Sequence, residues 1–460
     1  MSKFITIDIG SSFVKAALFD LCSHTLIAKD KRPSPQKTLK SDPNCFEVPA
    51  ECYMDLVQDL LDKLTTGISD ITGLLFSTQM HGIVFKPENA EPVYISWQDQ
   101  RCIEKNGEFS YLEELKKKIA PEDMLHHGVY LKPMMGLCNL YTAIQQKQFS
   151  PEGELFSLGS FITSRLCGKN ICHPHNAAPI GLIKVDTRDI DEKLIETLGL
   201  EKIKLPQIAK SDNEVIGEIS LNGNKIKIYP DFGDMQIAAL GSRIDKGCAL
   251  INIATASQVM YVTDSLKPGV FETRPFFGGL YLRTISQLPS GRTLKVVIDF
   301  LKQSIQSLCG TKLSDDDIWT KVHSLLKEEH KNESKSLIID PYFYASGNHL
   351  DGGNISGITA DNLNIGQIFK AMFVAMAHSY REHLEQLGNY EGISKIVCAG
   401  GVSFKVPELI EKIRLATKKD CQLPIMQDEA IFGMFIAAMY CSGNISSVYD
   451  NNDLTLTIKE

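Results

Sequence analysis

The 460-residue sequence predicts an α/β protein of two domains that close on a shared cleft. Three observations lead to this fold class. A strand, a tight turn and a second strand at the start of the chain recur far downstream. The length suits two domains of ordinary size, and segments of strand character alternate with segments of helical periodicity in both halves.

The first hairpin follows the apolar run Phe4–Ile7 and extends over Asp8–Asp20, with the sequence DIGSSFVKAALFD. Its turn consists of small residues, which leave backbone N–H groups and hydroxyls open to phosphate oxygens: Gly10, Ser11 and Ser12. Lys15 on the returning strand could add a positive charge. Asp8 is a carboxylate acceptor of the kind that Mg²⁺ prefers, with water as the bridging ligand. Taken alone, the segment is better explained as an ordinary β-turn.

The second hairpin, INIATASQVMYVTD over Ile251–Asp264, matches IDIGSSFVKAALFD over Ile7–Asp20 position by position. Both have an apolar lead, an amide or carboxylate, a turn rich in small and hydroxyl residues, an apolar return and a final Asp. Two such hairpins could hold one polyphosphate from opposite sides. The repetition therefore favours a phosphate site over two unrelated turns.

Hydrophobic spacing predicts the elements between and after the hairpins. They are a helix at Glu51–Leu64, a strand, turn and strand at Gly73–Phe85, a long core-facing helix at Ile365–Leu387, a strand ending in two glycines at Lys395–Val402, and a helix at Phe404–Thr417. The helix that starts behind the glycines is a plausible nucleotide cradle.

A third informative segment, YPDFGDMQIAAL over Tyr229–Leu240, predicts a strand that ends at a glycine and leads into a helix. Asp234 at this helix start could face a cleft and accept a proton from a substrate hydroxyl. The alternative is that Asp231 and Asp234 only cap the helix. The two hairpins favour the catalytic interpretation.

Composition limits the partners. A net charge of -8 and a pI near 5.8 argue against nucleic acid or an anionic membrane, which reward clustered Lys and Arg. Twelve cysteines without a CxxC pair are typical of reduced thiols in a cytosolic protein. The sequence shows no leader peptide, and no apolar run approaches the length of ~20 residues that spans a bilayer. We therefore expect a cytoplasmic protein that is monomeric or homodimeric. The metal-like spacing of Cys172, His173 and His175 is more simply explained by loop residues.

The chain resembles carbohydrate kinases of the FGGY family through the first hairpin and three motifs in the same order. These are QMHG at Gln79–Gly82, WQDQR at Trp97–Arg101 and GDMQIAAL at Gly233–Leu240. The resemblance implies two RNase H-like domains of the actin-like ATPase, sugar kinase and Hsp70 superfamily, at residues 1–242 and 243–460. ATP and a sugar would bind in the cleft between them.

The resemblance also implies roles for individual residues. The β- and γ-phosphates of ATP would be held by the first hairpin together with Thr255 and Ser257, with Lys15 near the transferring group and Asp8 organising Mg²⁺. Gly400 and Gly401 would lie against the adenosine. Asp234 would be the general base and would contact the sugar. The remaining sugar contacts would come from the first half: Gln79, Met80, His81, Trp97, Asp99 and Asn176.

The chemistry of these side chains suits a polyol, because Gln, His, Asp and Asn pair with vicinal hydroxyls and an aromatic face packs on C–H groups. Taken singly, Trp97 and His81 are better explained as core residues, and only the joint pattern favours sugar contacts. Within the family, STQMHGIVF at Ser77–Phe85 and SWQDQRC at Ser96–Cys102 most resemble sedoheptulokinases. We therefore expect sedoheptulose as the acceptor and sedoheptulose 7-phosphate as the product.

Two other functions remain open. One is a kinase for xylulose or another pentulose, and the other is a kinase-like protein that binds sugar or nucleotide as a sensor without turnover. Val406 and the segment Ser346–Asn348 depart from the family pattern at positions associated with the nucleotide. These departures bear on nucleotide affinity and not on the phosphate chemistry.

Overall fold

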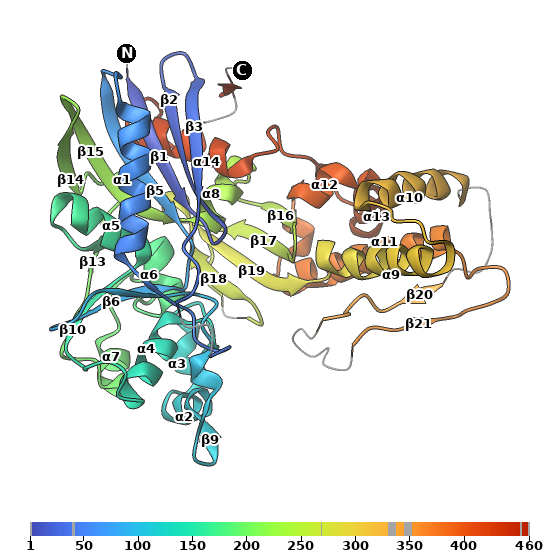
Figure 1. Cartoon of the computed structure of the whole chain (residues 1–460), viewed down its shortest axis with the longest axis horizontal. Coiled ribbons are helices and arrows are strands. Elements are labelled where there is room, and N and C mark those ends of the chain that lie inside the picture. The colour runs from blue at the N-terminus through green and yellow to red at the C-terminus, as the bar shows by residue number, and fades with distance from the viewer. Residues whose placement is uncertain are drawn as a thin grey trace.

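Two β-sheets, one from each half of the chain, lie on opposite sides of a central pair of helices in a computed structural model (Figure 1). The structure describes residues 2–38, 42–267, 269–329, 337–344, 352–450 and 453–458. We call residues 2–242 the N-terminal lobe and residues 243–458 the C-terminal lobe.

The first sheet has seven strands. Their order is β14 (Gly217–Leu221), β15 (Asn224–Gly233), β5 (Ile71–Thr78), β1 (Lys3–Ile9), β2 (Phe13–Asp20), β3 (Thr25–Pro33) and β24 (Thr457–Ile458). β1 pairs antiparallel with β2 and parallel with β5. The last strand, β24, is the end of the described chain and joins β3 at the edge of this sheet.

The second sheet has six strands and repeats this arrangement. Their order is β18 (Glu272–Pro275), β19 (Tyr281–Leu288), β17 (Ser257–Thr263), β16 (Cys248–Ile253), β22 (Lys395–Ala399) and β23 (Cys421–Gln422). β16 pairs antiparallel with β17 and parallel with β22, as β1 does with β2 and β5. The repeated hairpin is therefore a structural repeat.

A smaller five-stranded sheet extends the N-terminal lobe, at the lower left of Figure 1. Its order is β12 (Ile203–Lys204), β10 (Gly153–Phe156), β6 (Ile83–Pro87), β7 (Val93–Ile95) and β4 (Glu47–Pro49). Three two-stranded ribbons complete the strands: β11 (Ile171–Cys172) with β13 (Gln207–Ile208), β8 (Lys105–Asn106) with β9 (Phe109–Ser110), and β20 (Ile338–Ile339) with β21 (Ile355–Ser356).

Helices cover both sheets. In the N-terminal lobe they are α1 (Glu51–Thr65), α2 (Tyr111–Lys118), α3 (Pro121–Leu125), α4 (Gly136–Gln145), α5 (Leu158–Cys167), α6 (Pro174–Ile180), α7 (Glu192–Leu198) and α8 (Asp234–Gly241). In the C-terminal lobe they are α9 (Gly291–Cys309), α10 (Asp315–Glu329), α11 (Ile365–Gln386), α12 (Gly401–Lys405), α13 (Pro407–Thr417) and α14 (Glu429–Cys441). Among the described helices, none combines the length and apolar character that crossing a membrane requires.

Helices α8 and α14 form the centre of the molecule, because their side chains share one apolar core with residues of both sheets. The two helices touch through their backbones. A Cβ on Gly433 of α14 would overlap the carbonyl oxygen of Ile237, and a Cβ on Gly241 of α8 would overlap that of Glu429. Glycine at both positions allows this close approach.

Most predicted elements are confirmed. One predicted helix is wrong, and the residue pairing of the second hairpin differs from that of the first. The helix predicted over Phe404–Thr417 is two helices, because Pro407 cannot donate the backbone hydrogen bond that would continue α12 and instead begins α13. The two hairpins also differ by one residue. Asp8 pairs with Lys15, but its counterpart Asn252 pairs with Gln258, so the second turn is one residue tighter.

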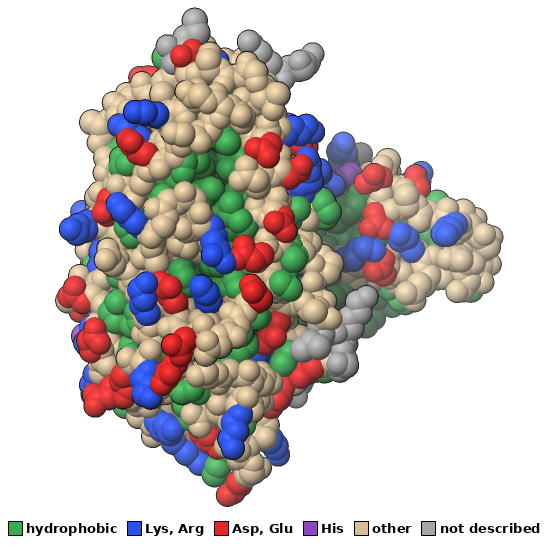
Figure 2. All heavy atoms as spheres, turned by 60° about the vertical axis from the view of Figure 1, so that its left-hand side comes forward, with side chains coloured by type: hydrophobic (Ala, Val, Ile, Leu, Met, Phe, Trp, Pro, Cys, Tyr) green, Lys and Arg blue, Asp and Glu red, His purple; other side chains and the backbone are tan. Residues whose placement is uncertain are grey.

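Acidic and basic side chains are interspersed over the face of the molecule that Figure 2 presents. This distribution agrees with the modest net charge of the sequence.

We expect Gly433→Ala to lower the free energy of unfolding by about 2 kcal/mol or more, since the added methyl group must push α14 away from α8. Urea unfolding followed by circular dichroism measures this change. Gly401→Ala is the matched control, because a Cβ there meets no atom within 4 Å. Equal stabilities of the two variants would contradict a tightly packed crossing.

Candidate functional site

The first hairpin presents its turn to the cleft. Ser11 and Ser12 are exposed at the tip, and Ser34 braces the turn from the end of β3, with its Oγ donating to the Gly10 carbonyl at 2.7 Å and its N–H donating to the Ser12 carbonyl at 3.0 Å. Lys15 Nζ lies 4.0 Å from Asp8 Oδ2. The hydroxyls and the cation that a phosphate chain needs are thus on one short, supported turn.

The second hairpin is held by the start of α9. Ser290 Oγ donates to the Ala254 carbonyl at 2.6 Å, and the N–H of Arg292 donates to the Thr255 carbonyl at 3.1 Å. Thr255 is exposed at the tip, whereas Ser257 is fully buried and its Oγ lies 2.9 Å from the Tyr380 hydroxyl. The role of Ser257 in phosphate binding therefore stays a prediction that requires this pair to open.

One cavity of about 300 Å³ brings the two hairpins and the helix start together. It is lined by Asp8, Gly10, Asp234, Met235, Ala238, Ala239, Ser242, Leu250, Asn252, Gln258, Met260, Ala399, Glu429 and Ala430. Asn252 and Gln258 were not singled out from the sequence. The repeat itself was the signal that could have found them, because Asn252 is the counterpart of Asp8 and Gln258 occupies the place that Lys15 has in the first hairpin.

Asp234 is the first residue of α8 and follows the end of β15. Its Oδ1 accepts from the N–H of Met235 at 2.8 Å. Burial, and then the nearby negative charge of Asp8, raise the pKa of Asp234 to about 7. A carboxyl group with this pKa can accept a proton near neutral pH and is a suitable general base.

Asp8 is the candidate Mg²⁺ residue. Burial raises its pKa above the ordinary value, while Lys15 and a hydrogen bond from Ser77 oppose the rise. A divalent cation would relieve the repulsion between the Asp8 and Asp234 carboxylates and hold both ionised. The two buried carboxylates are therefore suited to a hard metal ion carried in with phosphate.

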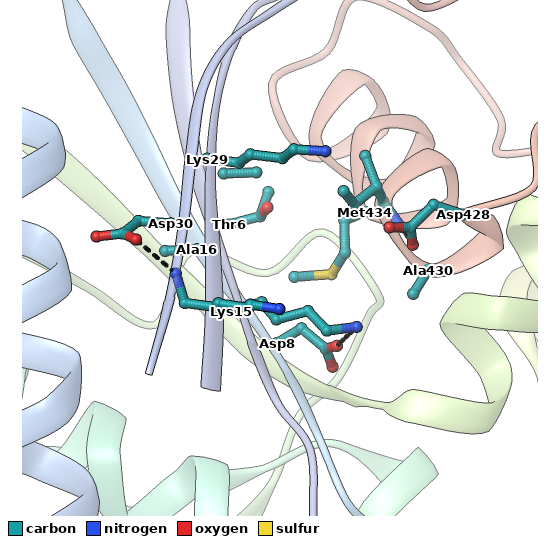
Figure 3. A pocket seen from close by; sticks show the side chains of 12 residues that line it. Thr6, Asp8, Lys15, Ala16, Lys29, Asp30, Asp428, Ala430 and Met434 are labelled. Atoms are coloured by element: carbon teal, nitrogen blue, oxygen red, sulfur yellow. Dashed lines mark hydrogen bonds and ion pairs between the residues drawn. The ribbon is translucent and has the colours of Figure 1, made fainter. Parts of the chain in front are cut away.

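A second cavity, of about 380 Å³, also adjoins the first hairpin (Figure 3). Its wall includes Asp8, Lys15 and Lys29 from the first sheet and Asp428 and Met434 from the start of α14. Asp8 lines both cavities. The carboxylate expected to organise Mg²⁺ can therefore be reached from both cavities.

The QMHG turn links β5 of the first sheet to β6 of the small sheet. The Gln79 N–H donates to the Ile9 carbonyl at 3.0 Å, so this turn lies directly beside the first hairpin. Met80 packs so closely against Gly233 that a Cβ there would lie 2.5 Å from its sulfur. Gln79, Met80 and His81 are all buried, and Met80 lies beside the residue that precedes Asp234.

Three residues near this turn were missed by sequence reasoning: Arg274, Glu272 and Lys132. Arg274 on β18 of the C-terminal lobe reaches His81, with its Nη2 3.3 Å from His81 Nε2, and also donates to Glu272. Lys132, from the loop before α4, donates to the same Glu272 carboxylate. These contacts join segments far apart in the sequence, and no motif or periodicity marks them.

Asn176 and Asp99 make mainly structural contacts. Asn176 Nδ2 donates to Asp231 Oδ2 at 2.7 Å and to the Thr78 hydroxyl at 3.1 Å. Asp99 is fully buried, and its carboxylate accepts from the Arg101 guanidinium and from the N–H of Phe46. The sugar-binding role of both residues stays a prediction, as does that of Trp97, which is half-buried after β7.

Asp231, weighed as a helix cap, instead binds the elements behind the site together. It accepts from Ser157 Oγ at 2.7 Å, from the N–H of His173 at 3.2 Å and from Asn176. Burial raises its pKa to about 6, with these hydrogen bonds opposing the rise. Asp231 therefore positions α5 and α6 against the strand that ends at Asp234.

The glycines predicted to face adenosine form a turn between β22 and α12. Gly400 has φ +85°, and a Cβ there would strike the backbone of Ile253, so glycine is required. Gly401 faces open space. An apolar cavity of about 120 Å³ next to this turn is lined by Gly291, Leu294, Lys295, Ile298, Trp319, Val402, Lys405 and Val406. Val406 thus lines this small cavity, while Ser346–Asn348 lie outside the described residues.

His173 and His175 were expected in a loop, and this expectation is wrong, because they lie buried at the start of α6 beside Asp212. His173 Nδ1 accepts from the N–H of His175 at 3.2 Å, so Nε2 carries the proton and donates to Asp212 Oδ1 at 3.2 Å. Asp212 also accepts from the N–H of Gly278 at 3.0 Å. Both ring nitrogens of His173 are thus engaged, and through Asp212 the cluster links the N-terminal lobe to Gly278 of the C-terminal lobe.

Comparison with known proteins supports the interpretation of this geometry. Residues 3–241 match the model of the N-terminal domain of the FGGY family of carbohydrate kinases. The chain is 22% identical over 476 residues to the xylulose kinase of Lactococcus lactis subsp. lactis strain IL1403, covering 96% of this chain and 88% of that protein.

Solved structures show the same fold. The ligand-bound xylulose kinase of Lactobacillus acidophilus has a TM-score of 0.82 at 18% identity, covering 100% of this chain and 94% of that one. Plasmodium falciparum glycerol kinase with ADP has a TM-score of 0.82 at 17% identity, covering 100% and 93%. The predicted fold class, two RNase H-like domains of the actin-like ATPase superfamily, is confirmed. This chain belongs to the FGGY family of carbohydrate kinases and is an ATP-dependent carbohydrate kinase of that type.

Proposed function

We propose that the protein transfers the γ-phosphoryl group of ATP to the terminal primary hydroxyl of a ketose, with Asp234 as the general base. One observation carries the proposal: Asp234, whose pKa is raised to about 7, lines the same cavity as Asp8 and Gly10 of the first hairpin and Asn252 and Gln258 of the second. A base in that place can reach a hydroxyl aimed at a phosphate that the hairpins hold.

In this mechanism the sugar oxygen forms a bond to the γ-phosphorus while the bond to the ADP oxygen breaks, and the hydroxyl proton passes to Asp234. Lys15 and the hairpin N–H and hydroxyl groups orient the phosphates and spread their charge. Asp8 would hold Mg²⁺, which supplies neutralisation of the phosphate charge. The glycine turn at Gly400 and Gly401 and the apolar cavity beside it would accept adenosine.

Sedoheptulose is the favoured acceptor because of the motif resemblance at Ser77–Phe85 and Ser96–Cys102. Xylulose is the second candidate, because full-length relatives at low identity include a xylulose kinase. Discrimination between them is expected from the sugar side, since buried donors and acceptors left unpaired by a missing hydroxyl weaken binding strongly.

A substrate panel tests the choice of acceptor. ADP release in a coupled assay, measured as kcat/KM for sedoheptulose, xylulose, ribulose, fructose and glycerol, is expected to be highest for sedoheptulose. A clear preference for a five-carbon ketose would transfer the proposal to the pentulose alternative. Binding of sugar without release of ADP from any acceptor would favour the sensor and contradict the kinase reaction on a ketose.

Asp234→Asn tests the base. We expect kcat to fall on the order of a hundredfold or more, because the amide cannot accept the hydroxyl proton, while the KM for the ketose changes less. Asp264→Asn is the matched control, since Asp264 is an exposed carboxylate paired with Lys246. Turnover of Asp234→Asn close to that of the control would show that Asp234 is not the base.

The pH dependence provides a separate check. Asp234 must be ionised to act, so kcat/KM for MgATP, which reports the enzyme before Mg²⁺ binds, is expected to fall about tenfold per pH unit below an apparent pKa near 7. Initial rates between about pH 5.5 and pH 8.5 measure this acid limb. A flat profile down to the lower limit would mean that the essential carboxylate has an ordinary pKa.

A further inference from the structure

Arg274 reaches from the C-terminal lobe to the QMHG turn of the N-terminal lobe, Gln79–Gly82, which we call the sugar motif. It lies on β18, is 3% exposed, and its Nη1 lies 3.9 Å from the sulfur of Met80 while its Nη2 lies 3.3 Å from His81 Nε2. The next residue along β18, Pro275, accepts at 3.2 Å from Gln236 of α8, two residues beyond Asp234. Arg274 is thus fixed between the sugar motif and the helix that carries the base.

His81 is prepared to accept from Arg274. Its Nδ1 lies 3.0 Å from the Pro179 carbonyl, which can only accept, so Nδ1 carries the proton and Nε2 has the free lone pair. Burial, followed by the charges of Lys132 and Arg274, holds the pKa of His81 well below its usual range, so the ring is neutral. The backbone of His81 has φ +69°, a strained conformation of the kind that clusters at functional sites.

The guanidinium still has unused donors. Of its five N–H groups, one is taken by Glu272 and one by His81, and the contact with Met80 sulfur is weak. Nε is buried and has no hydrogen-bond partner within the described part of the chain. A buried donor without an acceptor costs about 1–3 kcal/mol. Nε of Arg283 on the neighbouring strand is unpaired in the same way, so it is the place of Arg274 beside His81 that points to a ligand. An oxygen atom of a ligand would supply the missing acceptor.

Glu272 fixes the position of the guanidinium. Its carboxylate accepts from Arg274 and from Lys132, which lies on the N-terminal lobe. The charges of Arg274 and Lys132 hold the pKa of Glu272 well below its usual value, so it stays ionised. The cluster is therefore a charged bridge that joins Lys132 and His81 of the N-terminal lobe to Glu272 and Arg274 of the C-terminal lobe.

We propose that Arg274 is a sugar-binding residue supplied by the C-terminal lobe, whose free N–H groups donate to hydroxyl or carbonyl oxygens of the ketose between His81 and Asp234. The proposal rests on the proposed function. It makes the sugar site complete only when the two lobes are closed, so sugar binding and lobe closure favour each other. It also places a positive charge beside the base, since Arg274 lowers the pKa of Asp234.

Arg274→Lys and Arg274→Gln test the proposal. We expect the KM for the ketose to rise about tenfold to a hundredfold in both variants, as for the loss of a charged hydrogen bond, while the KM for ATP stays within about twofold because the phosphate hairpins do not contact Arg274. Arg283→Lys is the matched control. Arg283 is buried on the neighbouring strand β19 and donates to the carbonyls of Leu387 and Ser265, so its loss lowers the melting temperature without changing the ketose KM.

Two further measurements separate binding from folding. Calorimetric titration of the ketose into the full chain without ATP is expected to show the same loss of affinity in Arg274→Gln. The acid limb of kcat/KM is expected to move to higher pH in that variant, because removal of the positive charge raises the pKa of Asp234. Thermal melting of each variant identifies those that are folded.

The outcomes distinguish the two proposals. In one outcome the wild-type protein phosphorylates a ketose while both Arg274 variants keep the wild-type KM and affinity for it. That result would show that Arg274 only joins the two lobes, and it would overturn this inference alone. A wild-type chain that neither binds nor phosphorylates any ketose of the panel would overturn the proposed function, and this inference with it. A ketose-specific loss in both variants, absent from Arg283→Lys, is the result expected.

Discussion

The backbone contact between α8 and α14 is the constraint on which the site depends. Both helices begin at the cleft, with Asp234 opening α8 and Asp428 capping α14. Glycines at Gly241 and Gly433 let the helices cross with their backbones touching, and each helix also packs against both sheets. A bulkier residue at the crossing would therefore separate the two hairpins as well as the two helices. Because Gly241 and Gly433 have no side chains, the two helices lie close together, and their separation sets the width of the cavity between the hairpins.

Charge is controlled just as closely as distance. Asp8 and Asp234 are two acids in one partly buried place, and each makes ionisation of the other harder. Lys15 lies near Asp8, and the positive charge of Arg274 lowers the pKa of Asp234. Asp234 has a pKa near neutrality and feels charges from both lobes. Its protonation state therefore responds to lobe closure and to bound phosphate more strongly than that of an isolated carboxylate would.

Local pattern was sufficient to predict the features that lie within one segment. The two hairpins, the strand and helix around Asp234 and the glycine turn at Gly400 were all visible in residue types and spacing, and the structure repeats them at equivalent places. The missing parts depend on tertiary packing. The second turn is one residue tighter, which brings Gln258 opposite Asn252, and the residue types in the turn do not reveal this change. The burial of Ser257 depends on Tyr380, which is more than a hundred residues away in the sequence. Arg274 likewise meets His81 only because the lobes face each other.

The central position of α14 affects how the chain acquires its fold during synthesis. The inner face of the first sheet, with Phe19, Leu75 and Phe232, is covered by residues that include Phe435 of α14. These partners are separated by more than 350 residues at one end and by about 200 at the other. A chain emerging from the ribosome N-terminus first would thus carry an uncovered apolar sheet until the ribosome has nearly finished. The N-terminal lobe is therefore the first to be made and among the last to be fully packed.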